Sequence, residues 1–323
     1  MNTVQTTRKQ TMPTIALVGA TGAIGNSIAT ALRQEGTPYR AIGRNRQSLE
    51  REFGADPLAE IVTWNPDDPA SVRSAMRGID TAIYLIGVPY DQFQLHPQIM
   101  KKTLDGAIAE GVAKMLLIGT VYPFGLPQTA KVAESHPRNP NTFKGQMRKE
   151  QEDLLMAADK AGQIHGAILR LPDFYGIGVE KSLLDGIFKA IKTGKSAQLI
   201  GPIDTPHEFI FVPDVGPIVR DLIAQPNAYG RSWNLAGHSV ITQRQFAEKA
   251  FAQAGKKPKL MVAGPSVVRI IGWFQPLMRE ISKMAYLQQT PVLMDDTDLR
   301  KLLPNLKKTS YDEGIRQIVS SIA

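Results

Sequence analysis

The chain has 323 residues, a length that predicts roughly two domains or one large α/β unit with an appendage. Hydrophobic residues make up 43% and charged residues 21%, so a disordered or fibrous chain is excluded. Because the chain has no cysteine, a disulfide scaffold, a thiolate zinc site and a cysteine nucleophile are also excluded. The formal net charge is +8, but Lys and Arg are scattered among acidic residues, and this pattern argues against nucleic-acid binding.

The sequence shows neither a signal peptide nor a membrane-spanning segment. Residues 1–12 are polar and lack the apolar core of a signal peptide, so we expect a flexible tail there. No run of about 18 apolar residues exists, and the nearest, Met261 to Phe274, is interrupted by Pro265 and Arg269. We therefore expect a cytoplasmic protein that does not span a membrane.

Short apolar runs alternate with segments of helical period through the first half of the chain. The expected strands are residues 14–18, 39–42, 61–64, 81–86, 115–118 and 167–171. Between the first two, Ile24, Ile28 and Leu32 form one apolar stripe on a helix that Gly36 ends. Further helices are expected around residues 100–108 and 147–158. This alternation predicts an α/β fold with a doubly wound parallel sheet over residues 13–171.

After Leu171 the pattern becomes irregular, with Pro and Gly clusters followed by shorter strands and helices. We expect residues 172–323 to form a smaller C-terminal substrate lobe, with residues 208–235 returning to the sheet.

The turn after the first strand carries a glycine pattern that predicts a phosphate loop of the Rossmann type. Gly19 permits a tight turn, Gly22 lets the backbone approach a pyrophosphate, and Gly25 lets the helix lie close to the strand. The helix N-terminus offers free N–H groups and partial positive charge to the phosphates. The expected cofactor-binding residues of this turn are Gly19, Thr21, Gly22, Ala23, Ile24 and Gly25.

The end of the second strand favours NADP(H) over NAD(H). NAD-specific sites place an acidic residue about 20 positions after the glycines, whereas a basic residue accommodates a 2′-phosphate. Here Arg44 and Arg46 stand at that place, and guanidinium groups hold phosphate by paired hydrogen bonds. NAD(H) remains the second choice. Asn65, just past the third strand, is placed to border the adenine.

Residues 19–25 resemble the fingerprint of the extended short-chain dehydrogenase/reductases, the NAD-dependent epimerase/dehydratase family. Residues 116–125 look like the segment that carries that family's catalytic Ser/Thr, which implies Thr120. Residues 170–176 look like the stretch beside the nicotinamide, and residues 211–215 resemble the family's Val-x-Asp-Val segment. The resemblance implies a Rossmann fold. Further expected cofactor contacts are Ile86, Leu171, Asp173 and Phe174, and Asp173 can face either the nicotinamide carboxamide or the substrate.

The resemblance departs at the family's Tyr-x-x-x-Lys pair, in which the Tyr exchanges a proton and the Lys makes it more acidic. Alignment on the following Gly and on Glu152 puts Lys144 and Arg148 at those two positions. Arg148 keeps a cation that can hold the ribose, but a guanidinium cannot act as a base. Lys144 can exchange a proton if burial and the neighbouring guanidinium disfavour its charged form, or it can simply face solvent.

Three further residues are candidates at the mouth of the site. Tyr122, two residues past Thr120, is a rival proton donor and a substrate contact, or it packs the loop. Tyr175 is a weaker substrate contact for which packing is preferred. His207 lies where the lobe should meet the cleft, and its imidazole can hold a substrate hydroxyl or lie on the surface. The histidines show no ligand spacing, so no metal site is expected.

The leading hypothesis is an NADP(H)-dependent oxidoreductase, or an epimerase or dehydratase, acting by hydride transfer on a small carbonyl or hydroxyl compound. The alternative is a non-catalytic NADP(H)-binding sensor or regulator, which the missing Tyr encourages. The expected partner is a small-molecule substrate, with no nucleic acid and no membrane, and a homodimer is left open.

Overall fold

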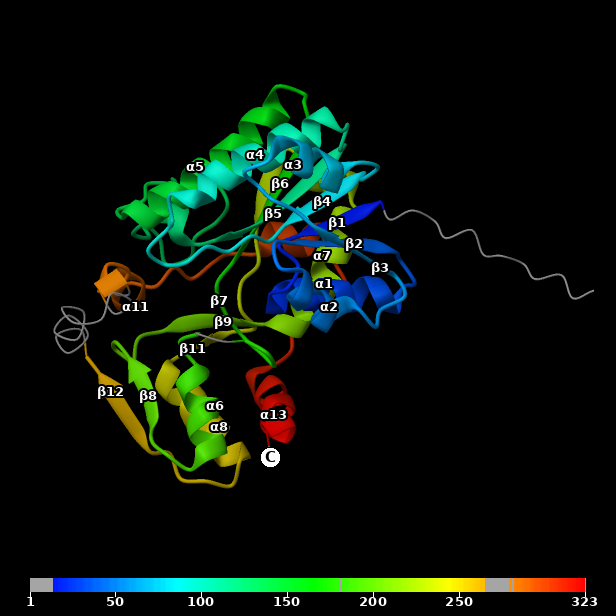
Figure 1. Cartoon of the computed structure of the whole chain (residues 1–323). Helices are drawn as coiled ribbons and strands as arrows, with labels where there is room; N and C mark the ends of the chain where they lie inside the picture. Colours follow the sequence, from blue (N-terminus) through cyan, green and yellow to red (C-terminus); the bar gives the residue numbers. More distant parts are fainter. Residues whose placement is uncertain (1–13, 180–181, 265–278, 281, 323) are drawn as a thin grey trace, which may run out of the picture.

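The computed structural model describes residues 14–179, 182–264, 279–280 and 282–322. A seven-stranded parallel sheet has helices on both faces, and a smaller lobe lies beyond one edge of these layers (Figure 1). The strand order is β10-β6-β5-β4-β1-β2-β3. The strands are β1 (Ile15–Val18), β2 (Tyr39–Gly43), β3 (Ala59–Thr63), β4 (Thr81–Tyr84), β5 (Lys114–Thr120), β6 (His165–Leu171) and β10 (Arg231–Asn234). The predicted doubly wound parallel fold is thus confirmed.

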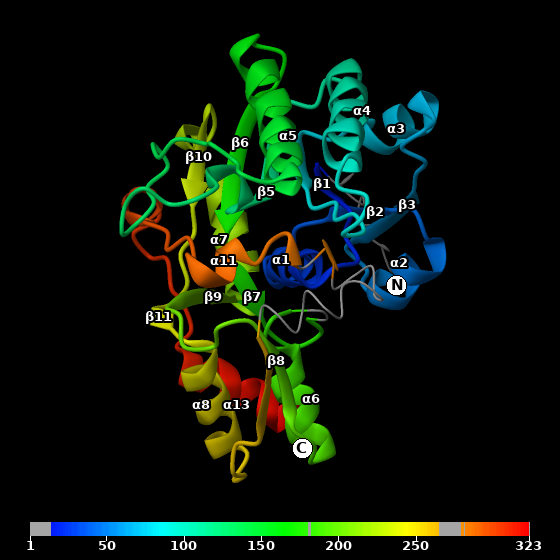
Figure 2. The same cartoon turned by 90° about the vertical axis from the view of Figure 1, so that its left-hand side faces the viewer.

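Each face of the sheet buries its own apolar core. One core lies under α3 (Pro69–Met76), α4 (Leu95–Ala109) and α5 (Phe143–Lys160), and the other under α1 (Ala23–Gln34), α2 (Arg46–Phe53), α7 (Val212–Ile223) and α12 (Thr297–Leu302). Figure 2 shows α4 and α5 on one side of the strands and α1 on the other. Since both faces are covered, all five residues of β2 are buried, Arg40 included.

The strand order places a topological switch point between β1 and β4, from which the chain winds outward in both directions. In open α/β sheets ligands bind at the carboxyl ends of the strands beside such a point. The residues that follow β1, β2, β4, β5 and β6 therefore define the functional edge of the sheet.

The described residues of the smaller lobe form two small sheets and three helices of eight residues or more. One sheet has the order β11-β9-β7, formed by β11 (Val240–Ile241), β9 (His207–Phe211) and β7 (Asp173–Tyr175), and the other pairs β8 (Ala197–Ile200) with β12 (Leu260–Ala263). The helices α6 (Asp185–Thr193), α8 (Gln243–Gln253) and α13 (Tyr311–Ile322) enclose an aromatic core. The remaining short elements are Tyr122–Phe124, Pro226–Ala228 and α11 (Tyr286–Gln289).

The chain passes from the sheet layers to the lobe and back. After β6 it enters the lobe at β7, and after β9 it returns through α7 and β10, which pairs with β6 as the edge strand. It then re-enters the lobe at β11. The place where β6 meets β7 and β9 meets α7 is consequently where lobe residues come close to the functional edge.

Helix α1 is held by two close backbone approaches that require glycine. A Cβ atom on Gly25 would lie 2.0 Å from the carbonyl oxygen of Ala20, in the loop before the helix. A Cβ atom on Gly216 of α7 would lie 2.1 Å from the carbonyl oxygen of Ser27. The Ser27 hydroxyl also donates to the Val212 carbonyl and accepts from the Gly216 amide, at 2.8 and 2.9 Å. Contact between α1 and α7 therefore fixes the helix that begins at the phosphate loop.

We predict that Gly216→Ala lowers the free energy of unfolding by about 1–3 kcal/mol, because α7 must move away from α1 to make room for the methyl group. Urea denaturation measures the change. Gly87→Ala is the matched control, since Gly87 is exposed and no atom lies within 4 Å of an added Cβ. Equal stabilities of the two variants would contradict the tight contact between these helices.

Candidate active site

The turn between β1 and α1 has the geometry of a phosphate loop. Gly19 has φ of +89°, a conformation that only glycine adopts without strain, and its amide donates to the Ile42 carbonyl at 2.9 Å. Gly22 faces open space, with no atom within 4 Å of an added Cβ. The amides of Ala23 and Ile24 donate to no acceptor within the described chain. Open space beside free N–H groups at a helix N-terminus fits a pyrophosphate.

Ile86 lies against this loop from the neighbouring strand. A Cβ on Gly19 would lie 3.0 Å from Ile86 Cγ1, so the chain after β4 borders the turn. Thr21 is exposed at the tip of the loop. The predicted cofactor residues around β1 and β4 therefore come together, and their contacts with a dinucleotide stay a prediction.

The two arginines after β2 have different surroundings. Arg46 is exposed, and its Nε donates to Glu50 Oε1 at 2.7 Å on the same helix. Arg44 is exposed, and we find no ion pair for it with any other described residue. Asn65 is exposed after β3, where its side chain accepts from the Asp67 amide at 3.0 Å. Arg44 is therefore the better candidate for a 2′-phosphate ligand.

Two hydroxyl groups stand at the carboxyl end of β5. Thr120 pairs in register with Leu171 of β6, and its Oγ1 accepts from the Tyr122 amide at 3.4 Å. The Tyr122 hydroxyl lies 2.9 Å from the Tyr90 hydroxyl. Burial raises the pKa of Tyr122 well above its usual value, and the nearby Tyr90 and Asp173 raise it further. Both tyrosines thus keep their protons at neutral pH, and one hydroxyl donates to the other.

Lys144 is buried, so the solvent-facing alternative is wrong. It is 3% exposed, and Thr142 caps its helix by accepting from the Gly145 amide at 3.1 Å. Its Nζ forms an ion pair with Glu280 and lies 5.1 Å from the centroid of the Tyr90 ring. Nothing local in the sequence signals this carboxylate, which holds the Lys144 side chain in place. Lys144 therefore fits a fixed cation better than a proton-exchanging group.

Arg148 lies one turn further along α5 and is 6% exposed. Its Nη1 donates to His96 Nδ1 at 3.1 Å and its Nη2 donates to the Ile118 carbonyl at 3.2 Å. Burial and the guanidinium together lower the pKa of His96 to about 2, so this imidazole stays neutral and accepts. The guanidinium is thus fixed beside the end of β5, and its contact with a ribose remains a prediction.

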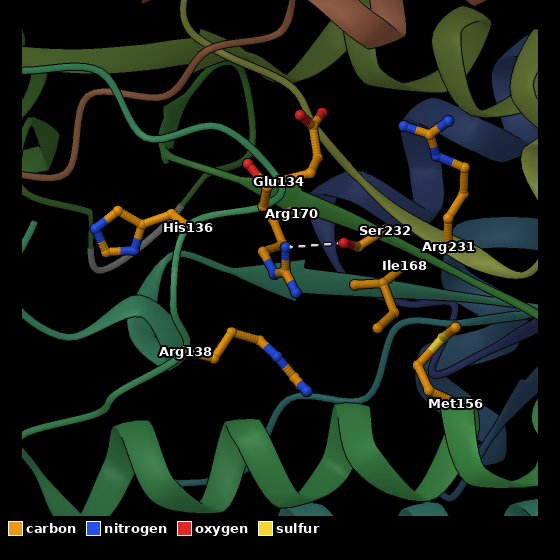
Figure 3. Close-up of a pocket in the computed structure, with 9 residues that line it drawn as sticks. Glu134, His136, Arg138, Met156, Ile168, Arg170, Arg231 and Ser232 are labelled. Carbon is orange, nitrogen blue, oxygen red and sulfur yellow. Dashed lines mark hydrogen bonds between the residues drawn. The ribbon is translucent and has the colours of Figure 1, made fainter. Parts of the chain in front are cut away.

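Glu152 and Arg170 form a buried ion pair behind the site. Arg170 Nε and Nη2 donate to the two carboxylate oxygens of Glu152 at 2.9 and 2.8 Å, and Arg138 adds a third contact at 3.1 Å. Arg170 Nη1 also donates to Ser232 Oγ at 3.1 Å (Figure 3). These arginines border a cavity of about 640 Å³ at the β6–β10 edge. Its lining residues are Glu134, Ser135, His136, Arg138, Met156, Ile168, Arg170, Arg231 and Ser232. No residue of the phosphate loop lines it, so this cavity is separate from the expected cofactor cleft.

The lobe contributes an Asp–His pair. His207, the first residue of β9, lies with Nε2 2.7 Å from Oδ2 of Asp173, the first residue of β7. Asp173 follows β6 by two residues, and its charge raises the pKa of both Tyr90 and Tyr122, so the pair lies near the tyrosines. The structure therefore brings His207 and Asp173 to the same edge as Thr120 and Tyr122.

Burial describes the surroundings of three neighbouring residues, and it agrees with the preferred packing role of Tyr175. Tyr175 is 1% exposed, and its ring packs 5.0 Å from the Phe246 ring in the lobe core, so it does not face substrate. The Leu171 side chain is 3% exposed within the sheet core, which leaves only its backbone for a cofactor contact. Phe174 is half-buried against the same core.

Sequence reasoning missed Tyr90, His96 and Glu280. Tyr90 lies in the segment after β4. Its only signal in the sequence was this position, after a strand next to the switch point. His96 contacts Arg148 because α4 packs on α5, and this contact between helices has no local pattern in the sequence. Glu280 is 136 residues from its partner Lys144, and nothing local in the sequence marks it.

The described residues contain neither a cluster of metal ligands nor a membrane-spanning helix. In the described ranges no group of three or more metal-ligating side chains lies together. None of the helices described here has both the length and the apolar character needed to cross a bilayer.

Comparison with known proteins identifies the family. Residues 15–236 match the NAD-dependent epimerase/dehydratase family model. A dTDP-6-deoxy-L-talose 4-dehydrogenase (NAD(P)(+)) of Kitasatospora kifunensis is 24% identical over 75% of this chain and 79% of its own length.

Solved structures share the fold at low sequence identity. A dTDP-glucose 4,6-dehydratase of Bacillus anthracis in complex with NAD has a TM-score of 0.79 at 14% identity, covering 96% of each chain. A UDP-glucuronic acid 4-epimerase of Bacillus cereus in complex with NAD has a TM-score of 0.78 at 16% identity, covering 95% of this chain and 98% of the other. Since the family model covers more than half of the residues, the chain belongs to the NAD-dependent epimerase/dehydratase family and is an enzyme of the extended short-chain dehydrogenase/reductase type.

Proposed function

We propose that this enzyme uses NADP(H) to interconvert a carbonyl and a secondary hydroxyl group on a sugar-like substrate. The observation that carries the proposal is the convergence of Thr120 and Tyr122 at the carboxyl end of β5. This strand neighbours β4, whose following residue Ile86 borders the phosphate loop. In this proposal a dinucleotide with its pyrophosphate on the loop extends toward β5 and places its nicotinamide near the two hydroxyls.

When bound, the nicotinamide supplies the hydride, and the protein supplies orientation and electrostatics. Thr120 and Tyr122 donate hydrogen bonds to the substrate oxygen, where negative charge develops during reduction. Arg148, held by His96 and Ile118, places a fixed positive charge beside them. The ammonium of Lys144 is balanced by Glu280, so Lys144 holds the Tyr90 ring in place and leaves the proton transfer to another group.

Relatives support a sugar as the substrate class. The matched dehydrogenase is named for a dTDP-linked deoxysugar, and the matched structures are named for dTDP- and UDP-linked sugars. A nucleotide carrier needs cations for its diphosphate, and the sequence offers Lys189, Lys192 and Lys195. Lys189 is on the exposed face of α6 and pairs with Asp185 at 2.6 Å, so this segment does not form a ready diphosphate site. The activity test therefore includes nucleotide-linked sugars and free sugars as two separate sets of substrates.

We predict that NADPH binds more tightly than NADH by about 1–3 kcal/mol, because the exposed Arg44 can pair with a 2′-phosphate. Arg44→Asp should reverse the order. Fluorescence titration measures the affinities for NADPH and NADH. Arg51→Asp is the control, since Arg51 is exposed further along α2. Equal affinities of the parent for the two cofactors would refute the preference.

We predict NADPH-dependent reduction of at least one compound in a panel of free small ketoses, dicarbonyls and a dTDP-4-keto-6-deoxy sugar. Thr120→Val should lower the rate by about 10²–10³-fold with NADPH affinity retained, because one donor to the developing oxyanion is lost. Thr193→Val on the exposed end of α6 is the matched control. Saturable NADPH binding with no loss of absorbance at 340 nm across the panel would instead support the non-catalytic sensor.

A further inference from the structure

We infer that His207, oriented by Asp173, supplies the proton in the proposed reaction, and that Tyr122 serves only as a hydrogen-bond donor. This inference rests on the proposed function. It answers the question that the replacement of the family's Tyr by Lys144 leaves open, namely which group exchanges a proton with the substrate oxygen.

The hydrogen-bond geometry prepares His207 for this task. A carboxylate can only accept, so the 2.7 Å contact requires that Nε2 carry a hydrogen and donate it to Asp173 Oδ2. Nδ1 has no hydrogen-bond partner among the described residues and is therefore the nitrogen that can exchange a proton. The Phe209 ring, 4.7 Å away, packs against the imidazole and limits its rotation. A base held by a carboxylate and a ring has the fixed orientation that proton transfer needs.

The rival groups are poorly matched to proton transfer at neutral pH. An effective acid or base has a pKa near the working pH, as an ordinary imidazole does. Burial raises the pKa of Tyr122 well above 10 and burial also raises that of Tyr90, and Arg148 opposes the shift of Tyr122 only weakly. Lys144 is paired with Glu280. Partners therefore engage these groups, whereas Nδ1 of His207 has no hydrogen-bond partner among the described residues.

Strands β7 and β11 flank His207 in its sheet. Asp173 is the one carboxylate that faces it from β7, and the strand on the other side, β11, presents Ile241 in register. Its chain neighbour Glu208 is buried, accepts from the Met294 amide at 3.3 Å, and has its pKa raised by burial.

The proton step balances as follows. In reduction the carbonyl carbon gains the hydride, the π pair moves to oxygen, and the oxygen takes the proton from Nδ1 of an imidazolium. The imidazole left behind is neutral and still donates through Nε2 to Asp173. In oxidation Nδ1 removes the hydroxyl proton as the hydride leaves. Reduction therefore needs protonated His207 and oxidation needs the neutral form.

The first test is the pH dependence of turnover with the carbonyl that the panel identifies. In the parent, kcat for reduction should fall and kcat for oxidation of the product alcohol should rise as pH increases through neutrality. His207→Gln keeps a donor to Asp173 and should lower kcat about 10²-fold or more, with both pH trends lost. Tyr122→Phe should lower kcat but keep the trends, and His238→Gln, an exposed histidine, should change neither. Trends that survive in His207→Gln and vanish in Tyr122→Phe would overturn the assignment.

A second test does not depend on turnover. The ring signals of the five histidines are followed against pH by ¹H–¹³C NMR, with His207→Gln giving the assignment. Oxidised nicotinamide carries a positive charge that disfavours a nearby imidazolium, so the His207 midpoint should be lower with NADP⁺ bound than with NADPH by roughly half a pH unit. Identical midpoints would place His207 too far from the nicotinamide and overturn the inference, even in an active enzyme. A shifted midpoint without reduction of any carbonyl would support the location and count against the proposed function alone.

Discussion

The close contact between helix α1 and its two neighbours is the constraint on which the rest of the molecule depends. Because Gly25 and Gly216 carry no side chain, α1 lies directly against the loop before it and against α7. The helix N-terminus is thereby aimed into the open space beside Gly22. The same contact joins α7, the segment that comes from the lobe, to the cofactor half of the protein. The position of the phosphate loop and that of the lobe thus both depend on the close packing of α1.

The second feature of the site is the way its charges are compensated. Lys144 and Arg148 occupy two successive turns of α5, and both are buried. One is balanced by a carboxylate and the other is solvated by a neutral imidazole and a backbone carbonyl. A buried cation without such partners would be strongly destabilising. The two positions that resemble the family's Tyr-x-x-x-Lys pair therefore hold charges fixed by partners. In our proposal proton exchange falls to a group outside α5.

Much of the fold and the cofactor half of the site could be predicted from sequence because their signals are local. Strand-length apolar runs, the stripe on α1 and the glycines at residues 19–25 lie within a few residues of one another, and the structure places them as expected. The lobe side depends on contacts between distant segments. The pairing of Asp173 with His207 spans 34 residues and that of Lys144 with Glu280 spans 136, so neither leaves a periodic or local pattern. For Tyr175 a local signal was present but misleading. Its place in a family motif suggested a substrate contact, whereas its ring is buried in an aromatic core.

The pairing of Lys144 with Glu280 also bears on how the protein matures. Synthesis proceeds from the N-terminus, and domains generally fold as units once their residues have emerged. The phosphate loop and six of the seven sheet strands precede residue 172, whereas the partner of Lys144 comes more than a hundred residues later. A nascent chain could therefore acquire a dinucleotide-binding surface before the charges around its reaction centre are complete. The ion pair that fixes Lys144 would then form only with the last part of the chain, after the cofactor surface has already formed.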